Sequence, residues 1–162
     1  MYIKRKLSPT LEVYKNLRNS FFFIKKSSHR FTVTVGVGGN IGDVRRRFKH
    51  LYNYFKKDKR VGVVKISSIL KNPPFGYENQ NDFFNAVVLL KTSMQPMIFL
   101  DYLMRVEKKF LRKRSFENAP RTLDLDIIFF DNRHINKEKL QIPHPKWSQR
   151  ESVLIPLTDI QR

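Results

Sequence analysis

Residues 31–55 read FTVTVGVGGNIGDVRRRFKHLYNYF, and their pattern changes from that of a strand to that of a helix. The first part alternates β-branched residues and ends in glycines, which is typical of a strand that runs into a tight loop. Asp43 can cap the following helix, because its side chain can accept a hydrogen bond from an unpaired backbone N–H. Apolar residues then recur at helical spacing; they are Val44, Phe48, Leu51, Tyr52 and Phe55.

Further strands and a second helix are expected downstream. The strand patterns cover Val61–Leu70, Phe83–Lys91 and the sequence TLDLDIIFF at 122–130. The resulting order, β-α-β-β-α-β, predicts an α+β fold of the ferredoxin-like split-βαβ type, a sandwich in which two helices pack on one face of an antiparallel sheet. A turn at 131–132, an extended piece near Ile135 and a short helix after Ser148 are expected to follow.

Two details of the helices are predicted as well. The second helix should be capped by Thr92 or Ser93 and should hold Pro96 in its first turn, where the missing N–H does no harm. Its inner face should be lined by Leu100, Leu103, Met104 and Leu111. In the C-terminal helix, Pro156 is expected to interrupt the hydrogen-bond ladder.

Residues 1–30 are interpreted as a basic N-terminal extension of a domain that spans 31–162. The extension carries eight Lys or Arg residues and one Glu. A short helix over 9–19 and a strand over 20–25, both packed on the domain, are expected there. A signal peptide would need a longer apolar stretch than FFFI provides.

Composition limits the functions that are possible. The chain has 162 residues and 32 basic against 14 acidic ones, a net charge of +18, which favours polyanionic ligands or partners. No apolar run approaches the roughly 20 residues that cross a bilayer. Cysteine is absent, which excludes disulfides and thiolate metal sites and fits a reducing compartment. We expect a cytoplasmic monomer without a membrane partner. A nucleic-acid partner is not expected either, because the sequence lacks the aromatic-rich strand of RNA-binding modules.

The strongest chemical signal is the sequence RTLDLDI at 121–127. Residues two apart on a strand share a face, so Asp124 and Asp126 should point the same way, with Cα atoms roughly 6.5 Å apart. The opposite face should belong to the core, through Leu123, Leu125, Ile127 and Phe129. Two rigidly held carboxylates suit Mg²⁺, and a pair of ions can clamp a transferring phosphoryl group. The alternative is a solvated strand face with two ordinary aspartates.

Other polar residues extend this pattern. Arg112, Arg114 and Arg121 lie in the basic segment before the strand, where guanidinium groups match phosphate oxygens. Taken alone, they would be interpreted as a solvated loop. Glu107 lies on a largely apolar helix face and so needs a partner or a role. Asn72, Pro73, Phe75, Phe83 and Asn85 could hold a flat heterocycle by stacking and edge hydrogen bonds.

Four blocks of sequence together resemble the 6-hydroxymethyl-7,8-dihydropterin pyrophosphokinase family of folate biosynthesis. They are GGNIGD, SSILKNPPFGYENQNDFFNAVV, PRTLDLDIIFF and IPHP, in this order between Thr34 and Ile160. The resemblance implies an enzyme that converts ATP and a pterin alcohol to AMP and the pterin diphosphate with two Mg²⁺ ions. Asp124 and Asp126 match the metal ligands, and Asp126 is the nearest candidate for a base.

The resemblance also implies roles for other side chains. Arg112, Arg114 and Arg121 match catalytic arginines around the ATP phosphates. Further ATP contacts would come from Glu107, Lys139, His144 and Arg150. The pterin would be held by Asn72, Pro73, Phe75, Phe83 and Asn85.

The chain departs from the family pattern at three places. Ser152 stands where the family often has an aromatic residue that stacks on the pterin opposite Phe83. A Trp common in the loop before the last strand is replaced near Asn118, and GGN stands where GSN is usual. Two alternative functions are an RNA-binding module, although the sequence lacks the aromatic strand typical of such modules, and a family relative without catalytic activity.

Overall fold

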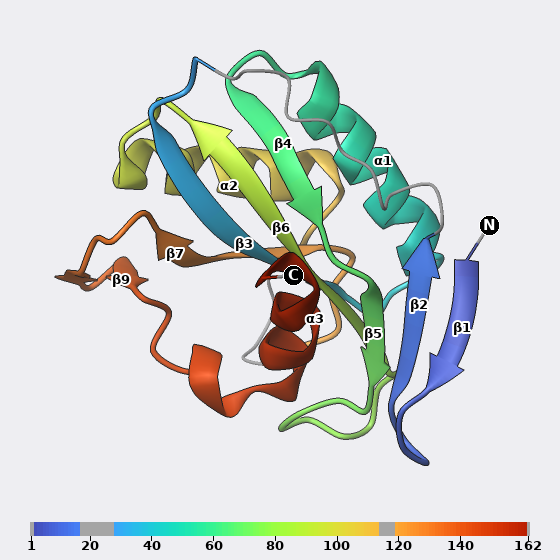
Figure 1. The fold of residues 1–162 in the computed structure, drawn as a ribbon. Coiled ribbons are helices and arrows are strands. Elements are labelled where there is room, and N and C mark those ends of the chain that lie inside the picture. Colours follow the sequence, from blue (N-terminus) through green and yellow to red (C-terminus); the bar gives the residue numbers. More distant parts are fainter. Residues whose placement is uncertain (1, 17–27, 114–118, 162) are drawn as a thin grey trace.

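The computed structural model describes residues 2–16, 28–113 and 119–161, and Figure 1 shows the path of the chain. The expected strand over 20–25, Arg114 and Asn118 lie outside these residues. The strands are β1 (Tyr2–Lys6), β2 (Glu12–Asn16), β3 (Phe31–Gly39), β4 (Val61–Ile66), β5 (Ile69–Asn72), β6 (Phe83–Thr92), β7 (Asp124–Phe130), β8 (Ile135–Lys137) and β9 (Leu140–Ile142). The helices are α1 (Val44–Lys57), α2 (Pro96–Lys109), a short 3₁₀ turn at Trp147–Gln149 and α3 (Glu151–Gln161).

The central sheet has the predicted topology. β3 pairs antiparallel with β6 on one side and with β7 on the other, and both β4 and β5 pair antiparallel with β6. The split-βαβ arrangement is therefore confirmed. It brings the glycine-rich end of β3 beside the start of β7, as the topology predicts.

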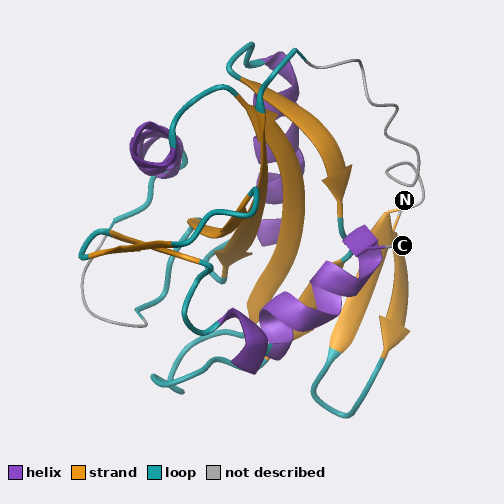
Figure 2. Cartoon of the chain, turned by 60° about the vertical axis from the view of Figure 1, so that its left-hand side comes forward, coloured by secondary structure: helices purple, strands orange, loops and turns teal. Residues whose placement is uncertain are grey.

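Helices cover both faces of the sheet. α1 and α2 lie behind the sheet in Figure 1, and α3 crosses in front of it; Figure 2 gives a second view of the same layers. The alternating residues Val33, Val35 and Val37 of β3 are buried in the core with apolar residues of α1 and α2. The face of β3 that points the other way carries Thr34, Gly36 and Gly38, and this face forms the floor of the candidate site.

The strand expected over Val61–Leu70 is two strands. β4 pairs with the second half of β6 and β5 with its first half, and the chain bends between them at Ser67 and Ser68. Ser67 Oγ accepts a hydrogen bond from Val87 N at 2.8 Å, and Ser68 N donates to Asp159 Oδ2 at 2.9 Å. Side-chain hydrogen bonds thus replace the ladder at the break and attach α3 to it.

The prediction of a helix over 9–19 is wrong for the part of this segment that the structure describes. Residues 12–16 form β2, which pairs antiparallel with β1 on one side and with β5 on the other. The extension thus adds a hairpin to the sheet edge. Tyr14 packs against the core with its ring 6.1 Å from that of Phe84. Tertiary pairing with β5 overrides the weak local helix preference of this segment.

Smaller expectations also need correction. The N-cap of α2 is Gln95, without a side-chain hydrogen bond, because the hydroxyl of Thr92 is used by Arg60 O and Met94 N. Leu111 lies beyond the end of α2 and is 76% exposed, with a positive φ of 63°. α3 continues through Pro156 to Gln161.

The prediction that Phe129 faces the core is wrong as well. A register shift in the β3–β7 ladder places Phe129 opposite Thr34 and Ile127 opposite Val35, so β7 carries one extra residue there. Such a bulge reverses the alternation beyond it. Phe130 therefore enters the core, and Phe129 packs on Trp147 with ring centroids 4.9 Å apart.

Candidate active site

Glycines on β3 leave an open floor between β6 and β7. Gly38 lies opposite Asn85 in one ladder and opposite Asp124 in the other, and Gly36 lies opposite Asp126. A Cβ at Gly38 would come within 3.0 Å of Asn85 Oδ1 and 3.7 Å of Asp124 Cβ. The missing side chain therefore lets an amide from β6 and a carboxylate from β7 flank the same patch of backbone.

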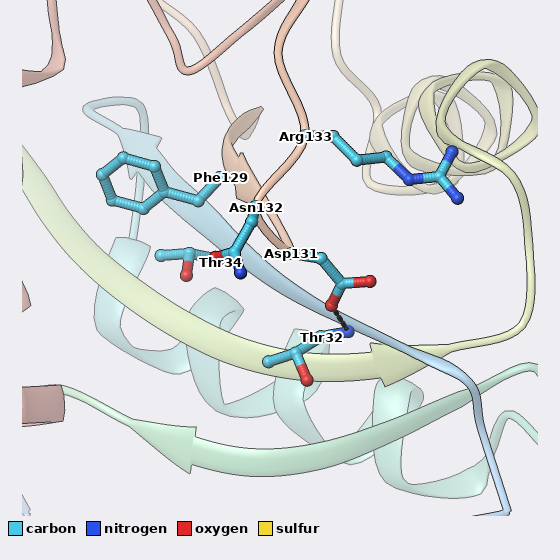
Figure 3. A pocket seen from close by; sticks show the side chains of 6 residues that line it. All are labelled: Thr32, Thr34, Phe129, Asp131, Asn132 and Arg133. Atoms are coloured by element: carbon cyan, nitrogen blue, oxygen red, sulfur yellow. Dashed lines mark hydrogen bonds between the residues drawn. The ribbon is translucent and has the colours of Figure 1, made fainter.

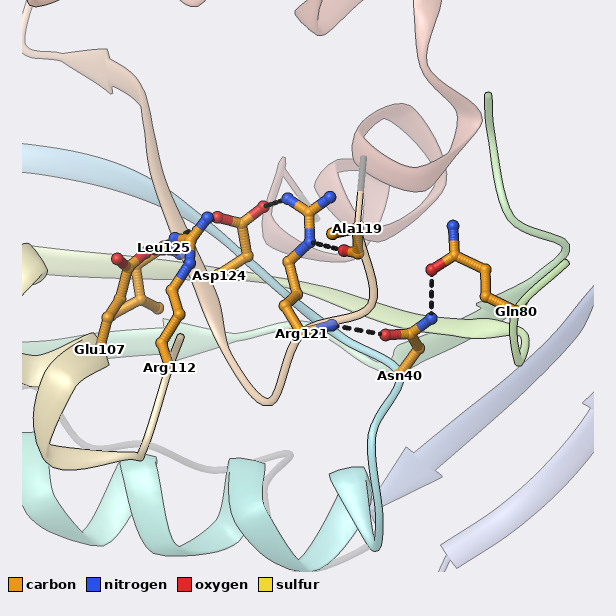
Figure 4. A network of polar contacts seen from close by, with 8 residues as sticks. All are labelled: Asn40, Gln80, Glu107, Arg112, Ala119, Arg121, Asp124 and Leu125. Atoms are coloured by element: carbon orange, nitrogen blue, oxygen red, sulfur yellow. Dashed lines mark hydrogen bonds and ion pairs between the residues drawn. The ribbon is translucent and has the colours of Figure 1, made fainter. Parts of the chain in front are cut away.

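Asp124 is held by two arginines. Its Oδ1 lies 2.6 Å from Arg112 NH1, and its Oδ2 accepts a hydrogen bond from Arg121 NH1 at 2.8 Å. Figure 4 shows both guanidinium groups directed at this one carboxylate. Arg121 Nε also donates to Ala119 O at 3.1 Å, which fixes the orientation of its planar head group. Two residues predicted to bind phosphate thus neutralise a residue predicted to bind metal.

Glu107 is the buried acid behind this pair. It is 3% exposed, and its Oε1 accepts a hydrogen bond from Leu125 N at 2.8 Å and contacts Arg112 NH1. Burial raises the pKa of Glu107, while the charge of Arg112 opposes that rise. Glu107 therefore links α2 to the backbone of β7 and positions Arg112, so its immediate partners are protein groups.

Asp126 lies in surroundings that disfavour its negative charge. Burial raises the pKa of Asp126 to about 7, and the negative charges of Asp124 and Glu107 add to this effect. Arg150 and Arg112 act in the opposite direction. The position is therefore short of positive charge. A hard divalent cation bound by the two aspartates would supply that charge, so the donor set fits Mg²⁺.

His144 and Arg150 lie on the same side as the aspartates. The backbone N–H of His144 donates to Ile128 O on β7 at 2.9 Å, and its Nδ1 accepts from Lys146 N at 3.2 Å. Burial and then the charge of Arg150 lower the pKa of His144, so the ring is neutral at pH 7. Lys139 lies exposed in the β8–β9 turn, and no polar contact between described residues joins it to the aspartates.

The residues predicted to hold the pterin divide into two groups. Asn85 Nδ2 donates to Asn72 Oδ1 at 2.7 Å, and the Phe83 ring lies 5.5 Å below the guanidinium of Arg121. These three residues adjoin Asp124 through Gly38 and Arg121. Phe75 is 77% exposed, and Pro73 is exposed beside it on the β5–β6 loop. The structure therefore brings the first group to the carboxylates and leaves the second in solvent.

Asn40 and Arg47 were missed by the sequence interpretation. Asn40 is 4% exposed and bonds to both neighbouring loops. Arg47 NH1 donates to Ile41 O at 2.6 Å and to Thr122 O at 3.2 Å. The sequence does show an asparagine directly after a glycine-rich strand end. Its hydrogen-bond partners could not be predicted, because they lie on loops that are distant in the sequence.

A surface hollow of about 720 Å³ lies farther along the same face of β3 (Figure 3). It is lined by Thr32, Thr34, Phe129, Asp131, Asn132 and Arg133. Asp131 Oδ1 accepts from Thr32 N at 2.7 Å, so its carboxylate already serves the turn after β7. None of the predicted site residues lines this hollow, and we place the candidate site at the glycine end of β3.

Among the described residues no helix is long and apolar enough to cross a membrane.

Comparison with known proteins identifies the family of this chain. The family model of 7,8-dihydro-6-hydroxymethylpterin-pyrophosphokinase (HPPK) matches residues 34–162. A 2-amino-4-hydroxy-6-hydroxymethyldihydropteridine pyrophosphokinase of Helicobacter pylori is 41% identical over 146 residues, which cover 87% of this chain and 90% of the relative. Proteins of the same name from Campylobacter jejuni and Bacillus subtilis are 38% and 37% identical, covering 85% and 78% of this chain and 87% and 75% of their own lengths. Since the family match covers most of the chain, including all of β6 and β7, the chain belongs to the HPPK family.

Proposed function

We propose that this chain transfers pyrophosphate from ATP to 6-hydroxymethyl-7,8-dihydropterin, giving AMP and the pterin diphosphate. The observation that carries the proposal is the carboxylate pair on β7, flanked by Arg112 and Arg121 within an HPPK-family fold. In this reaction the pterin hydroxyl oxygen bonds to the β-phosphorus, and the bond from that phosphorus to the oxygen bridging the α- and β-phosphates breaks. The hydroxyl proton is released, and AMP leaves with the bridging oxygen.

Asp124 and Asp126 would hold Mg²⁺, for which we propose two ions. When bound, the metal neutralises phosphate charge that builds up on the transferring group. A cation on Asp124 would replace the two guanidinium groups that now neutralise it, so Arg112 and Arg121 would become available to phosphate oxygens. Arg114 is proposed to join them, and positioning with charge neutralisation would then supply most of the acceleration. No dedicated base is assigned, and Asp126 is the nearest candidate.

The remaining nucleotide contacts are proposed from His144 and Arg150, with Lys139 as a peripheral cation. His144 is neutral and can donate a hydrogen bond to a phosphate from the ring nitrogen that is not used by Lys146 N. Glu107 is better described as the residue that positions Arg112 and β7 than as a direct ATP contact, since its Oε1 is used within the protein.

Asn72, Asn85 and Phe83 are proposed to bind the pterin, with Pro73 and Phe75 closing from the loop. Two amides that already share a hydrogen bond present fixed donors and acceptors to a heterocycle edge, and Phe83 supplies an aromatic face. Ser152 is half-buried and has no ring to offer on the opposite side. We further propose that residues 31–162 form the catalytic unit and that the chain is a cytoplasmic monomer.

The test is formation of AMP from ATP and the pterin in the presence of Mg²⁺. Wild type should form AMP only when the pterin is present, and Asp126→Ala should abolish the reaction. Asp101→Ala serves as the matched control, since Asp101 is an exposed carboxylate on α2. Direct Mn²⁺ binding, followed by electron paramagnetic resonance, gives a readout that does not depend on turnover. Wild type that binds nucleotide but makes no AMP would contradict the proposal.

A further inference from the structure

Asn40 occupies the junction of three segments of the site (Figure 4). It follows the last residue of β3, it is 4% exposed, and its side chain lies between the β5–β6 loop and the residues that precede β7. The β5–β6 loop, residues 73–82, carries Phe75 and leads into the proposed pterin residues of β6. The residues before β7 carry Arg121, which contacts Asp124.

The amide uses both of its donors and its acceptor oxygen across this junction. Its Oδ1 accepts from Arg121 N at 2.9 Å, and its Nδ2 donates to Gln80 Oε1 at 2.8 Å and to Asn81 O at 3.0 Å. The amide oxygen thus binds the backbone of Arg121, and the amide nitrogen binds the loop beside the proposed pterin residues. Aspartate has no donors for the loop, and alanine can bond to neither side.

The backbone around Asn40 leaves it little freedom to move independently. Asn40 N and Ile41 N both donate to Arg121 O, at 3.0 and 3.3 Å. A Cβ at Gly39 would come within 2.6 Å of Thr122 O, so the two chains approach as closely as glycine allows. Arg47 bridges Ile41 O and Thr122 O from α1. A displacement of the backbone at Arg121 must therefore move Asn40, and with it the hydrogen bonds to Gln80 and Asn81.

We propose that Asn40 is a positioning residue that couples the two substrates. Its side chain joins the β5–β6 loop to the backbone of Arg121. The position of Arg121 that binds nucleotide therefore also holds the loop in the position that binds pterin. The inference rests on the proposed function, because it needs the pterin on the β6 side and the nucleotide on the β7 side. Binding of either substrate should then tighten binding of the other by the same factor.

The experiment measures pterin affinity by calorimetry, with and without Mg²⁺ and a non-hydrolysable ATP analogue. Wild type should bind the pterin at least about fivefold more tightly when the analogue is present. Asn40→Asp keeps the bond from Arg121 N and loses both bonds to the loop, so this factor should fall below about twofold. Gln80→Met removes one acceptor for Asn40 Nδ2, together with the hydrogen bond from Gln80 Nε2 to Tyr77 O, without touching β3. It should lower the factor in the same direction. Affinity for the analogue alone should stay within about twofold of wild type in Gln80→Met.

Asn53→Asp is the matched control, because Asn53 is an exposed asparagine on α1. It should retain the wild-type coupling factor. A purely structural role for Asn40 would instead lower the melting temperature and weaken both substrates equally, with the factor unchanged. An unchanged factor in Gln80→Met and in folded Asn40→Asp would overturn the inference while AMP formation still supported the proposed function. Wild type that bound neither substrate would overturn both.

Discussion

Arg112 NH1 lies 2.6 Å from Asp124 Oδ1, and the pair joins a proposed phosphate ligand to a proposed metal ligand. Arg121 occupies the other carboxylate oxygen at 2.8 Å. Asp124 is thus neutralised by groups of the protein itself, whereas burial raises the pKa of Asp126 to about 7. Magnesium and the arginines must therefore compete for one carboxylate.

Removal of one competitor should separate metal binding from turnover. Arg121→Ala is expected to lower kcat by about 10²–10³, as loss of a group that stabilises developing charge does. The same change should tighten Mn²⁺ binding in the absence of nucleotide by several-fold, because it frees Asp124 Oδ2. Electron paramagnetic resonance and steady-state kinetics measure the two effects. Arg105→Ala, at an exposed position on α2, is the control, and unchanged Mn²⁺ affinity in Arg121→Ala would contradict the competition.

Asp126 should make the ligand-free protein less stable as the pH rises. Its pKa of about 7 in the folded state lies above the usual 3.8, so between these values the folded chain holds a proton that the unfolded chain has lost. The free energy of unfolding therefore decreases as pH rises through this window. Asp126→Asn cannot ionise, and at pH 8 it should melt several degrees above wild type. Thermal unfolding at pH 4 and pH 8 checks this, since the difference should nearly vanish at pH 4.

Two neighbouring glycines should respond differently to alanine. At Gly38 the new Cβ meets side-chain atoms, Asn85 Oδ1 at 3.0 Å and Asp124 Cβ at 3.7 Å. Gly38→Ala should therefore disturb the site, with a several-fold increase in the KM for pterin and little change in melting temperature. At Gly39 the Cβ meets the backbone of Thr122 at 2.6 Å. Gly39→Ala should cost about 1–3 kcal/mol of stability, which urea denaturation measures. Equal loss of stability in both variants would contradict this distinction.

Asp159 should contribute to stability rather than to substrate binding. Its carboxylate accepts from Ser68 N at 2.9 Å and from the Ser68 hydroxyl, and so holds α3 over the break between β4 and β5. Asp159→Ala should lower the free energy of unfolding by about 1–3 kcal/mol, because it leaves the backbone N–H of Ser68 without this acceptor. Glu138→Ala, at an exposed turn position, provides the comparison. A large rise in the KM for ATP in Asp159→Ala, without a loss of stability, would contradict this prediction.

Most of the fold could be predicted because its central elements have strong local signals. β3 begins and ends where the alternation in FTVTVGVGG does, and Asp43 caps α1 by accepting from Arg46 N at 3.0 Å. The N-terminal hairpin could not be predicted in this way, since β1 and β2 are short and polar and depend on pairing with β5. The bulge that turns Phe129 outward likewise depends on its partner strand.

The candidate site could be predicted only as a set of residue types on one strand and its neighbouring loops. Alternation on β7 placed Asp124 and Asp126 together, because strand geometry alone requires it. It could not show that Arg112 reaches Asp124 while Glu107 holds Arg112 from behind, since these contacts depend on how α2 packs against β7. The contacts of Asn40 are longer in range still, joining residues 40 and 81 positions apart.

The hairpin of β1 and β2 also changes what the molecule presents to other molecules. Without it, the open margin of the sheet would be β5, whose Ile69 and Leu70 are buried. With it, the margin becomes β1, where Lys4, Arg5 and Lys6 are exposed. Lysine-rich margins disfavour strand-to-strand pairing between copies, because like charges would be brought together in a row. Among the described residues, the hairpin thus places basic side chains, instead of the buried apolar residues of β5, at this margin of the sheet.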